Sequence, residues 1–380
     1  IGGGALGAGL LYFLTKEGWD DVVLVEKGEL TSGSTWHAAG LVPHFIGGLS
    51  MAKLHHVGSE LYKNLERETG QATGWHGCGA IRLGLTDDEV DWFHYVKGML
   101  DYLDIECHLI GQEEIRQLHP LLIVDDVKMG FYTPTDGHTD PASSTHAMAV
   151  GARLKGAEIY RHTQVLDTQL LGSGEWEVVT DKGSLICEHV VNAGGSFAKQ
   201  VGEWVGLDLP IVNMEHHYLV TENLPEIEAL DHEPPVVRDP KASCYYRQEQ
   251  QGILIGPYEK QGAQARGLKG VDWSFDMELL SPALERLENS LQHAGERIPC
   301  WSDAGIKRVV NGPITHTPDG GFLLGPAAGL RNYWLCCGAS IGITQGPGCG
   351  KYLAQWMVHG QTEINAVSYT HLTLPTNREV

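Results

Sequence analysis

The stretch Ile1-Gly2-Gly3-Gly4-Ala5-Leu6-Gly7 at the start of the chain decides the fold. Gly2, Gly4 and Gly7 fit the spacing G-x-G-x-x-G. In that motif the first glycine permits a tight turn, the second admits a pyrophosphate close to the backbone, and the third lets helix and strand pack closely. A diphosphate held there lies at a helix N-terminus, where free N–H groups favour negative charge. The stretch therefore predicts a dinucleotide site, with an ordinary strand–turn–helix as the alternative.

The residues after the motif support this prediction. Residues 8–16 are apolar and compatible with a helix, and residues 22–25 form an apolar, β-branched run typical of a buried parallel strand. Glu26 ends that run, at the distance where an acid accepts hydrogen bonds from ribose hydroxyls. The motif ordinarily follows a strand, and none precedes Ile1. We therefore expect the chain to be an N-terminally truncated fragment, in which a targeting segment can be neither observed nor excluded.

The composition narrows the class of protein. The chain has 380 residues, enough for two domains, and its formal net charge of −21 argues against nucleic acid as a partner. No apolar run is long enough to predict a membrane span. The eight cysteines form no C-x-x-C pair and no H-E-x-x-H occurs, so we expect no metal site and a reducing compartment, either a bacterial cytoplasm or a mitochondrial matrix.

The order of patterns predicts an α/β fold: a Rossmann-like dinucleotide-binding domain with an inserted α+β substrate domain and a mixed sheet. We assign residues 1–50, 140–210 and 305–360 to the discontinuous dinucleotide-binding domain. Residues 51–139 and 211–304 form the substrate or cap region. Residues 361–380 are expected outside the fold, because 369–380 have no continuity with the preceding helix; a disordered natural terminus is the alternative.

Local signals predict several individual elements. Thr86 and Glu89 form a capping box ahead of a helix. Residues 176–180 and 184–187 flank a turn and predict a hairpin. A charged helix is expected at 282–294, and a glycine-rich turn at 336–346 is expected to lead into a helix at 350–357.

Several motifs in the same order resemble one known family. They are Ser34-Thr35-Trp36-His37-Ala38-Ala39-Gly40, Gly79-Ala80-Ile81-Arg82-Leu83, Asp136-Gly137-His138-Thr139-Asp140-Pro141, Val191-Asn192-Ala193-Gly194, Tyr245-Tyr246-Arg247-Gln248-Glu249, Gly256-Pro257-Tyr258-Glu259, Asn311-Gly312-Pro313-Ile314-Thr315 and Gly350-Lys351-Tyr352-Leu353. From residue 1 to about 360 the chain resembles the flavin domain of dimethylglycine and sarcosine dehydrogenases, within the D-amino-acid-oxidase-like FAD-dependent oxidoreductases.

The resemblance implies roles for the cofactor-binding residues. His37 matches the covalent attachment residue, joined to the 8α carbon of the flavin ring. The glycine motif and Glu26 would hold the nucleotide, which Ala193 and Gly194 would also approach. Gly342 and Gly346 belong to a segment that passes the pyrimidine end of the flavin, although a plain strand-to-helix turn is the other interpretation.

His216 and Tyr245 match the active-site pair of the family. Neighbouring side chains of a strand face opposite ways, so His216 and His217 cannot both face the flavin. A histidine of near-neutral pKa could accept the ammonium proton of a substrate, and a tyrosine could orient the amine. Arg247 could hold a carboxylate bidentately, with a surface ion pair as an equally good interpretation, and Tyr246 is as well explained by strand packing.

The function implied by the resemblance is FAD-dependent oxidative demethylation of a small N-methyl amine, such as dimethylglycine or sarcosine. Hydride would pass to flavin N5, and the iminium would be released as formaldehyde or passed to folate. Tetrahydrofolate is expected only in a longer gene product, because many members carry a C-terminal folate-binding half. The electron acceptor would be an electron-transfer flavoprotein or oxygen. The alternatives are a flavin oxidase of another amine, amino acid or 2-hydroxy acid, a non-catalytic regulatory relative, and a fragment that binds no cofactor.

Overall fold

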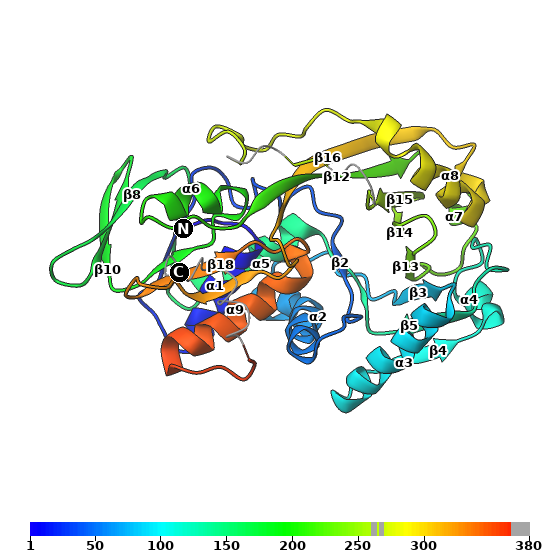
Figure 1. Cartoon of the computed structure of the whole chain (residues 1–380), viewed down its shortest axis with the longest axis horizontal. Helices are drawn as coiled ribbons and strands as arrows, with labels where there is room; N and C mark the ends of the chain where they lie inside the picture. Colours follow the sequence, from blue (N-terminus) through cyan, green and yellow to red (C-terminus); the bar gives the residue numbers. More distant parts are fainter. Residues whose placement is uncertain (260–263, 266–269, 366–380) are drawn as a thin grey trace, which may run out of the picture.

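The computed structural model describes residues 1–259, 264–265 and 270–365, so the expectation for residues 369–380 lies outside the described part. Figure 1 shows two regions joined by two long strands. The glycine motif, α1, α9 and β18 lie at the left, and β3, β4, β5 and β13–β15 lie at the right, with β12 and β16 running along the top between them. No helix of the described residues is long and apolar enough to cross a membrane.

The glycine motif forms a tight turn into α1 (Ala5–Lys16), which begins three residues earlier than expected. Gly2 has φ +111°, and a Cβ on it would lie 2.4 Å from the carbonyl oxygen of Ala193. A Cβ on Gly7 would lie 2.0 Å from the carbonyl oxygen of Gly2. Both positions therefore require glycine, the first for its conformation and the second for the close approach of turn and helix.

Short parallel strands flank the motif. β1 (Val23–Val25) pairs with β7 (Glu158–Tyr160), and β11 (Val190–Asn192) pairs with β18 (Tyr333–Cys337). The backbone of the first two residues lies between these pairs, because the N–H of Gly2 donates to Val25 and the terminal amine of Ile1 donates to Val191. β17 (Leu323–Pro326) adds an antiparallel strand beside β18. The parallel pairs and the glycine turn confirm the α/β, Rossmann-like class.

The helices of this region pack around α1 in one buried cluster, the first core. They are α2 (Leu49–Thr69), α5 (Pro141–Arg153) and α9 (Gly342–His359). We expected residues 51–139 in the cap, yet Leu54 and Leu65 of α2 are fully buried in the first core. Ile364 is also buried there, so the packed structure extends past residue 360.

Two expected boundaries are wrong. The glycine-rich segment becomes helical at Gly342 instead of residue 350, because its glycines let α9 lie directly on α1: a Cβ on Gly350 would be 2.4 Å from the carbonyl carbon of Gly9. The charged helix α8 spans Glu288–Arg297, and a 3₁₀ turn, η2 (Leu284–Arg286), replaces its expected first turns because Ala283 has a non-helical backbone.

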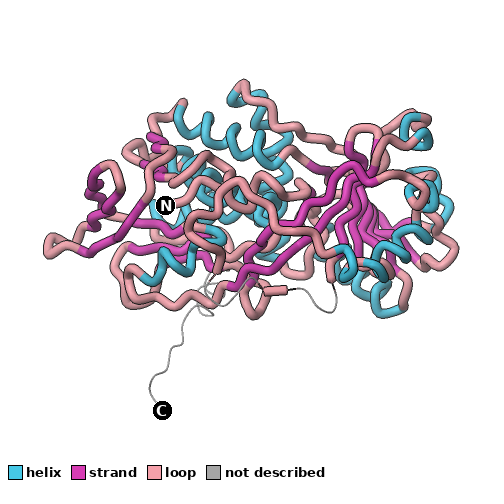
Figure 2. The backbone as a smooth tube through the Cα atoms, turned by 90° about the horizontal axis from the view of Figure 1, so that it is seen from above, coloured by secondary structure: helices cyan, strands magenta, loops and turns pink. Residues whose placement is uncertain are grey.

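A mixed sheet forms the second region, in the order β16-β12-β15-β14-β13-β3-β5-β4. β3 and β13 are parallel, and the other neighbouring strands of this sheet pair antiparallel. Figure 2 shows these strands side by side at one end of the molecule. The strands are β3 (Ala80–Gly84), β4 (His108–Ile110), β5 (Met129–Thr133), β12 (Val212–Thr221), β13 (Val236–Asp239), β14 (Cys244–Glu249), β15 (Gly252–Pro257) and β16 (Ile306–His316).

The remaining elements are short or peripheral. The capping box of Thr86 and Glu89 opens α3 (Asp87–Tyr102) as predicted. The predicted hairpin is also present, as β9 (Trp176–Thr180) and β10 (Gly183–Cys187). The others are β2 (Leu41–Val42), α4 (Gln112–Leu118), β6 (Gly137–His138), β8 (Val165–Leu170), η1 (Gly195–Phe197), α6 (Ala198–Glu203), α7 (Pro225–Glu228) and η3 (Pro299–Trp301).

Candidate active site

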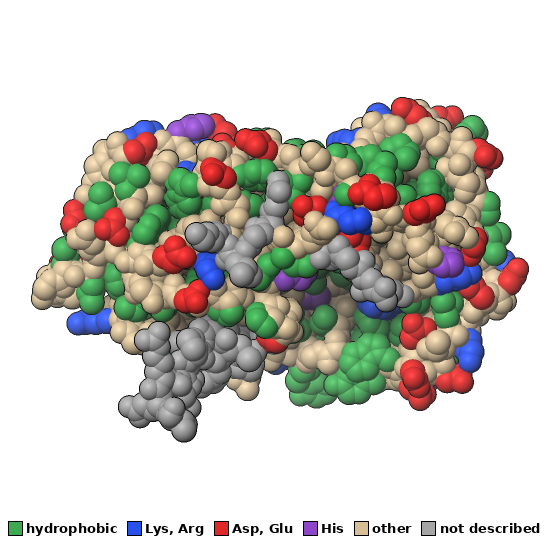
Figure 3. All heavy atoms as spheres, turned by 45° about the horizontal axis from the view of Figure 1, so that its top comes forward, with side chains coloured by type: hydrophobic (Ala, Val, Ile, Leu, Met, Phe, Trp, Pro, Cys, Tyr) green, Lys and Arg blue, Asp and Glu red, His purple; other side chains and the backbone are tan. Residues whose placement is uncertain are grey.

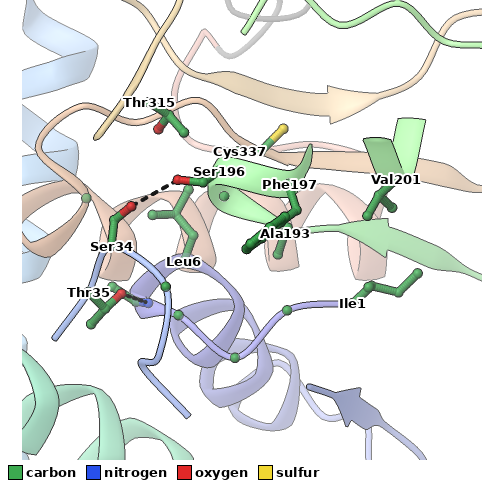
Figure 4. Close-up of a pocket in the computed structure, with 18 of the residues that line it drawn as sticks. Ile1, Leu6, Ser34, Thr35, Ala193, Ser196, Phe197, Val201, Thr315 and Cys337 are labelled. Atoms are coloured by element: carbon green, nitrogen blue, oxygen red, sulfur yellow. Dashed lines mark hydrogen bonds between the residues drawn. The ribbon is translucent and has the colours of Figure 1, made fainter. Parts of the chain in front are cut away.

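A first cavity lies over the N-terminus of α1 (Figure 4). Gly4 caps the helix without a side chain, and the N–H of Ala5 donates to Thr35 Oγ1 at 3.1 Å. Ser34 precedes Thr35 in the same segment, and its hydroxyl lies 3.1 Å from that of Ser196 and 2.6 Å from the carbonyl oxygen of Pro313. The walls thus offer backbone N–H groups and hydroxyls, which suit a diphosphate.

The predicted cofactor residues divide into two groups. Those that line the first cavity are Gly2, Gly4, Glu26, Ala193, Gly194 and Gly342. Glu26 accepts hydrogen bonds from the N–H groups of Gly3 (2.7 Å) and Gly28 (2.9 Å), which fix it beneath the motif. Gly7 and Gly346 are not among the lining residues. Each of them packs against backbone, Gly7 on Gly2 and Gly346 on Ala5, so their part is to bring helices and turn together.

A second cavity adjoins the first and shares a wall with it, formed by Ala38, Ile314, Ser340, Gly342 and Ile343. His216 and Tyr245 both line this second cavity, with the tyrosine hydroxyl 3.2 Å from His216 Nε2. Tyr258 completes the aromatic wall, its ring centroid 4.6 Å from that of His216. The structure therefore brings together the pair that the resemblance indicated.

His217 faces away from that cavity, as strand alternation predicted. Its Nε2 accepts a hydrogen bond from the N–H of Ala283 at 3.2 Å, and its Nδ1 lies 3.4 Å from a carboxylate oxygen of Glu259. This side chain is fully buried on the opposite face of β12.

The expectation of a near-neutral pKa at His216 is wrong. Burial, with the positive charges of His217 and Arg238 adding to it, lowers the pKa of His216 to about 3. Burial likewise raises the pKa of Tyr245 well above its ordinary value. At neutral pH both groups are uncharged, so the tyrosine donates its hydroxyl hydrogen and His216 is a weak base.

Two arginines that our sequence analysis gave no role face the same cavity. Arg82 on β3 and Arg238 on β13 are direct partners across these parallel strands. The guanidinium of Arg82 lies 4.4 Å from the ring centroid of Phe45, and that of Arg238 lies 4.4 Å from the ring centroid of Tyr258. An arginine in the middle of a short buried strand was the signal that could have found them.

Among the described residues no anion is paired directly with these two cations: Glu89 acts on Arg82 only through its charge, and Asp136 of the same cavity is hydrogen-bonded to His44. Within the described residues neither forms a salt bridge, and Arg238 Nη1 is buried without a hydrogen-bond partner. Burial, followed by repulsion from Arg238, lowers the pKa of Arg82 to about 10. A cavity wall with two adjacent, unneutralised guanidinium groups favours an anionic ligand group.

Arg247, the arginine that we considered for a carboxylate, is already satisfied. Its guanidinium lies 2.7 Å from a carboxylate oxygen of Glu249 and donates to the carbonyl oxygens of Ala39 (2.9 Å) and Gln248 (2.8 Å). It does not line the second cavity. The ion-pair interpretation is the one that the structure shows.

His37 precedes Ala38, a residue of the wall that the two cavities share, but is not itself among the lining residues of either cavity. It is buried, with only 5 % of its surface exposed, and its Nε2 has no hydrogen-bond partner. Its ring covers Gly312 of β16, where a Cβ would lie 2.3 Å from Cε1. Burial lowers its pKa to about 4, so the ring is neutral at pH 7. A neutral imidazole with an unpartnered buried nitrogen fits a residue that bonds to a cofactor.

Comparison with known proteins shows the family of the chain. The family model for FAD dependent oxidoreductases (DAO) matches residues 1–356, and the chain belongs to that family. Dimethylglycine dehydrogenase of Rattus norvegicus is 43% identical over 371 residues, which cover 97% of this chain and 43% of that protein. Sarcosine dehydrogenase of Mus musculus is 34% identical over 384 residues, 97% of this chain and 40% of that protein.

A regulatory protein is also among the relatives. The pyruvate dehydrogenase phosphatase regulatory subunit of Mus musculus is 32% identical over 376 residues, 96% of this chain and 41% of that protein. The chain thus spans less than half the length of these relatives. Among solved structures, L-proline dehydrogenase from P. horikoshii aligns with a TM-score of 0.84 and 25% identity, over 97% of this chain and 95% of that one. It confirms the fold.

Proposed function

We propose that this chain is the flavin-dependent part of an enzyme that oxidatively demethylates a small N-methyl amine bearing a carboxylate, such as dimethylglycine or sarcosine. The observation that carries this proposal is the pair Arg82 and Arg238, two half-buried cations that form no salt bridge with any described residue, on the wall that also holds His216 and Tyr245. FAD, when bound, accepts the hydride from the substrate carbon.

The protein's own groups bind and orient the substrate. Arg82 and Arg238 hold the carboxylate through charge-assisted hydrogen bonds. The aromatic wall of Tyr258 and Tyr245 surrounds the amine end. The Tyr245 hydroxyl, kept protonated by its raised pKa, donates a hydrogen bond. His216 holds that hydroxyl in place, since its neutral Nε2 lies 3.2 Å away.

We propose that the FAD is attached covalently through His37, whose buried Nε2 has no other partner. The N-terminus of α1 and the segment around Ser34 and Ser196 would hold its diphosphate part. Fluorescence of the acid-denatured protein on a gel tests this attachment. A fluorescent wild-type band that disappears in His37→Ala supports it, and a dark band from a yellow native protein refutes it.

The reaction itself is tested by anaerobic mixing of the FAD-loaded protein with dimethylglycine, sarcosine and dimethylamine. We expect the two amino acids to bleach the oxidised flavin spectrum and dimethylamine, which lacks a carboxylate, to fail. Equal bleaching by all three amines would remove the role of the arginines. A formaldehyde assay then shows whether the one-carbon unit is released or passed to folate. A peroxide assay shows whether the electron acceptor is oxygen or an electron-transfer flavoprotein.

The second candidate is a non-catalytic regulatory role, favoured by the relative that is a phosphatase regulatory subunit. His37, His216 and Tyr245 argue against it, because a protein without catalysis has no use for all three. A yellow protein that no amine or amino acid bleaches would favour the regulatory role.

A further inference from the structure

Three side chains that can bind metal ions converge outside both cavities. Glu233, in the loop before β13, contacts two histidines at once: one carboxylate oxygen lies 2.7 Å from His76 Nδ1, and the other lies 2.6 Å from His138 Nε2. The three ligand atoms all lie within 4.8 Å of one another. No sequence motif announces this cluster, because its members come from distant segments.

The backbone holds the two histidines together before any ligand binds. The N–H of His76 donates to the carbonyl oxygen of His138 at 2.8 Å, and the reverse hydrogen bond measures 3.0 Å. The rings stack with centroids 4.7 Å apart and planes 12° apart. A Cβ at Gly137 would lie 1.9 Å from the carbonyl oxygen of His76, so this close pairing depends on glycine. The two imidazoles therefore lie side by side, and a turn of one ring, the exposed His76, would bring both nitrogens onto one ion.

The cluster is open on one side and closed on the other. The side chain of His76 is 53% exposed, that of Glu233 is 26% exposed and that of His138 is 7% exposed. An ion and its water can therefore enter at His76.

We propose that His76, His138 and Glu233 form a binding site for a divalent transition-metal ion of the Zn²⁺ class. Two imidazole nitrogens and one carboxylate oxygen are a ligand set that Zn²⁺ accepts, with water completing the coordination. The ion replaces the hydrogen bonds that now join the carboxylate to the two rings. This proposal does not depend on the flavin reaction.

The three ligand residues lie next to segments that form the second cavity. His138 belongs to β6, whose partner β2 contributes Leu41 to the second cavity. Glu233 precedes β13, which carries Arg238 into the same cavity. A bound ion would tie these two walls to each other and stabilise the folded protein by mass action.

The test uses the FAD-loaded protein after dialysis against a chelator, with Co²⁺ and Zn²⁺ as probes. We expect Co²⁺ to bind in equimolar amount with visible d–d absorption, and Zn²⁺ to displace it and raise the Tm. His138→Gln and Glu233→Gln should lose both effects. His108→Gln, which removes an exposed histidine paired with a single glutamate, should keep them.

Absence of the Co²⁺ bands and of the Zn²⁺-induced Tm shift in the wild-type protein would overturn the proposal and leave a hydrogen-bonded triad. Metal binding by both ligand variants at the wild-type level would overturn it as well. Melting of each variant without metal separates lost binding from misfolding.

Discussion

Replacing Arg82 by methionine should weaken substrate binding without weakening the fold. Methionine keeps much of the side-chain length and the contact with Phe45 but removes the charge. The pKa of Arg82 is lowered from 12.5 to about 10, so its charge destabilises the folded state at pH 7 by about 3 kcal/mol at 1.36 kcal/mol per pKa unit. Loss of the cation–π contact over Phe45 offsets about 1 kcal/mol of that gain. We therefore expect the free energy of unfolding to stay constant or rise by up to about 2 kcal/mol.

Binding should change in the opposite direction. A hydrogen bond to a charged group contributes about 1.5–3 kcal/mol, so the Kd of a carboxylate ligand should rise by roughly ten- to 150-fold. Methoxyacetate is a suitable probe, because it carries the carboxylate but no amine, and 2-methoxyethanol is its control without the carboxylate. The assays are denaturant unfolding and titration of the flavin spectrum. Reduced stability together with unchanged methoxyacetate affinity would refute the reasoning, since that result marks Arg82 as a structural residue.

The other predictions concern pH, packing and catalysis. Burial lowers the pKa of His119 to about 4, so between pH 4 and 6.5 the folded protein binds fewer protons than the unfolded chain. The contribution of His119 to the free energy of unfolding, about 3 kcal/mol, is complete above pH 6.5 and is lost as the pH falls toward 4. His119→Gln should therefore flatten the pH dependence of the free energy of unfolding measured over that window. Gly350→Ala should destabilise the protein by about 1–3 kcal/mol, because the added Cβ meets the backbone of α1. Gly98→Ala should instead stabilise α3 by about 0.5–1 kcal/mol, because no atom lies within 4 Å of the added Cβ. Equal Tm shifts for the two variants would contradict the packing argument. His216→Gln should lower kcat/KM yet leave the pKa of its ascending pH limb unchanged, because a histidine of pKa about 3 does not titrate there; a displaced limb would restore His216 as the base.

Short-range patterns gave correct predictions wherever local geometry decides the outcome. The glycine spacing predicted the turn into α1, although the helix begins three residues before its expected start, and strand alternation separated His216 from His217. The capping box of Thr86 and the hairpin at residues 176–187 need only a few neighbouring residues. These features depend on backbone conformation and periodicity, which a sequence states directly.

The features missed by sequence analysis arise from pairing across the sheet. Arg82 and Arg238 become neighbours only because β3 and β13 lie parallel in register, although a long stretch of chain separates them. The ligand cluster of His76, His138 and Glu233 depends on an isolated bridge between short segments. The low pKa of His216 results mainly from burial, to which His217 and Arg238 add, so the sequence suggested a base where the fold makes a neutral group.

The surface and the interior of this protein carry opposite charge balances. The chain has 48 acidic and 27 basic side chains, and on the face drawn in Figure 3 the basic groups are scattered among acidic ones. The second cavity instead presents two arginines, the neutral histidines His55 and His216, and a single acid, Asp136, which is hydrogen-bonded to His44. A zwitterionic amino acid brings a carboxylate that this cavity stabilises and an ammonium group that it repels. We infer that the electrostatics of Arg82 and Arg238 select the deprotonated amine, the form from which hydride can leave, so that His216 need not act as a base. The same pair would thus account for recognition of the carboxylate and for activation of the amine.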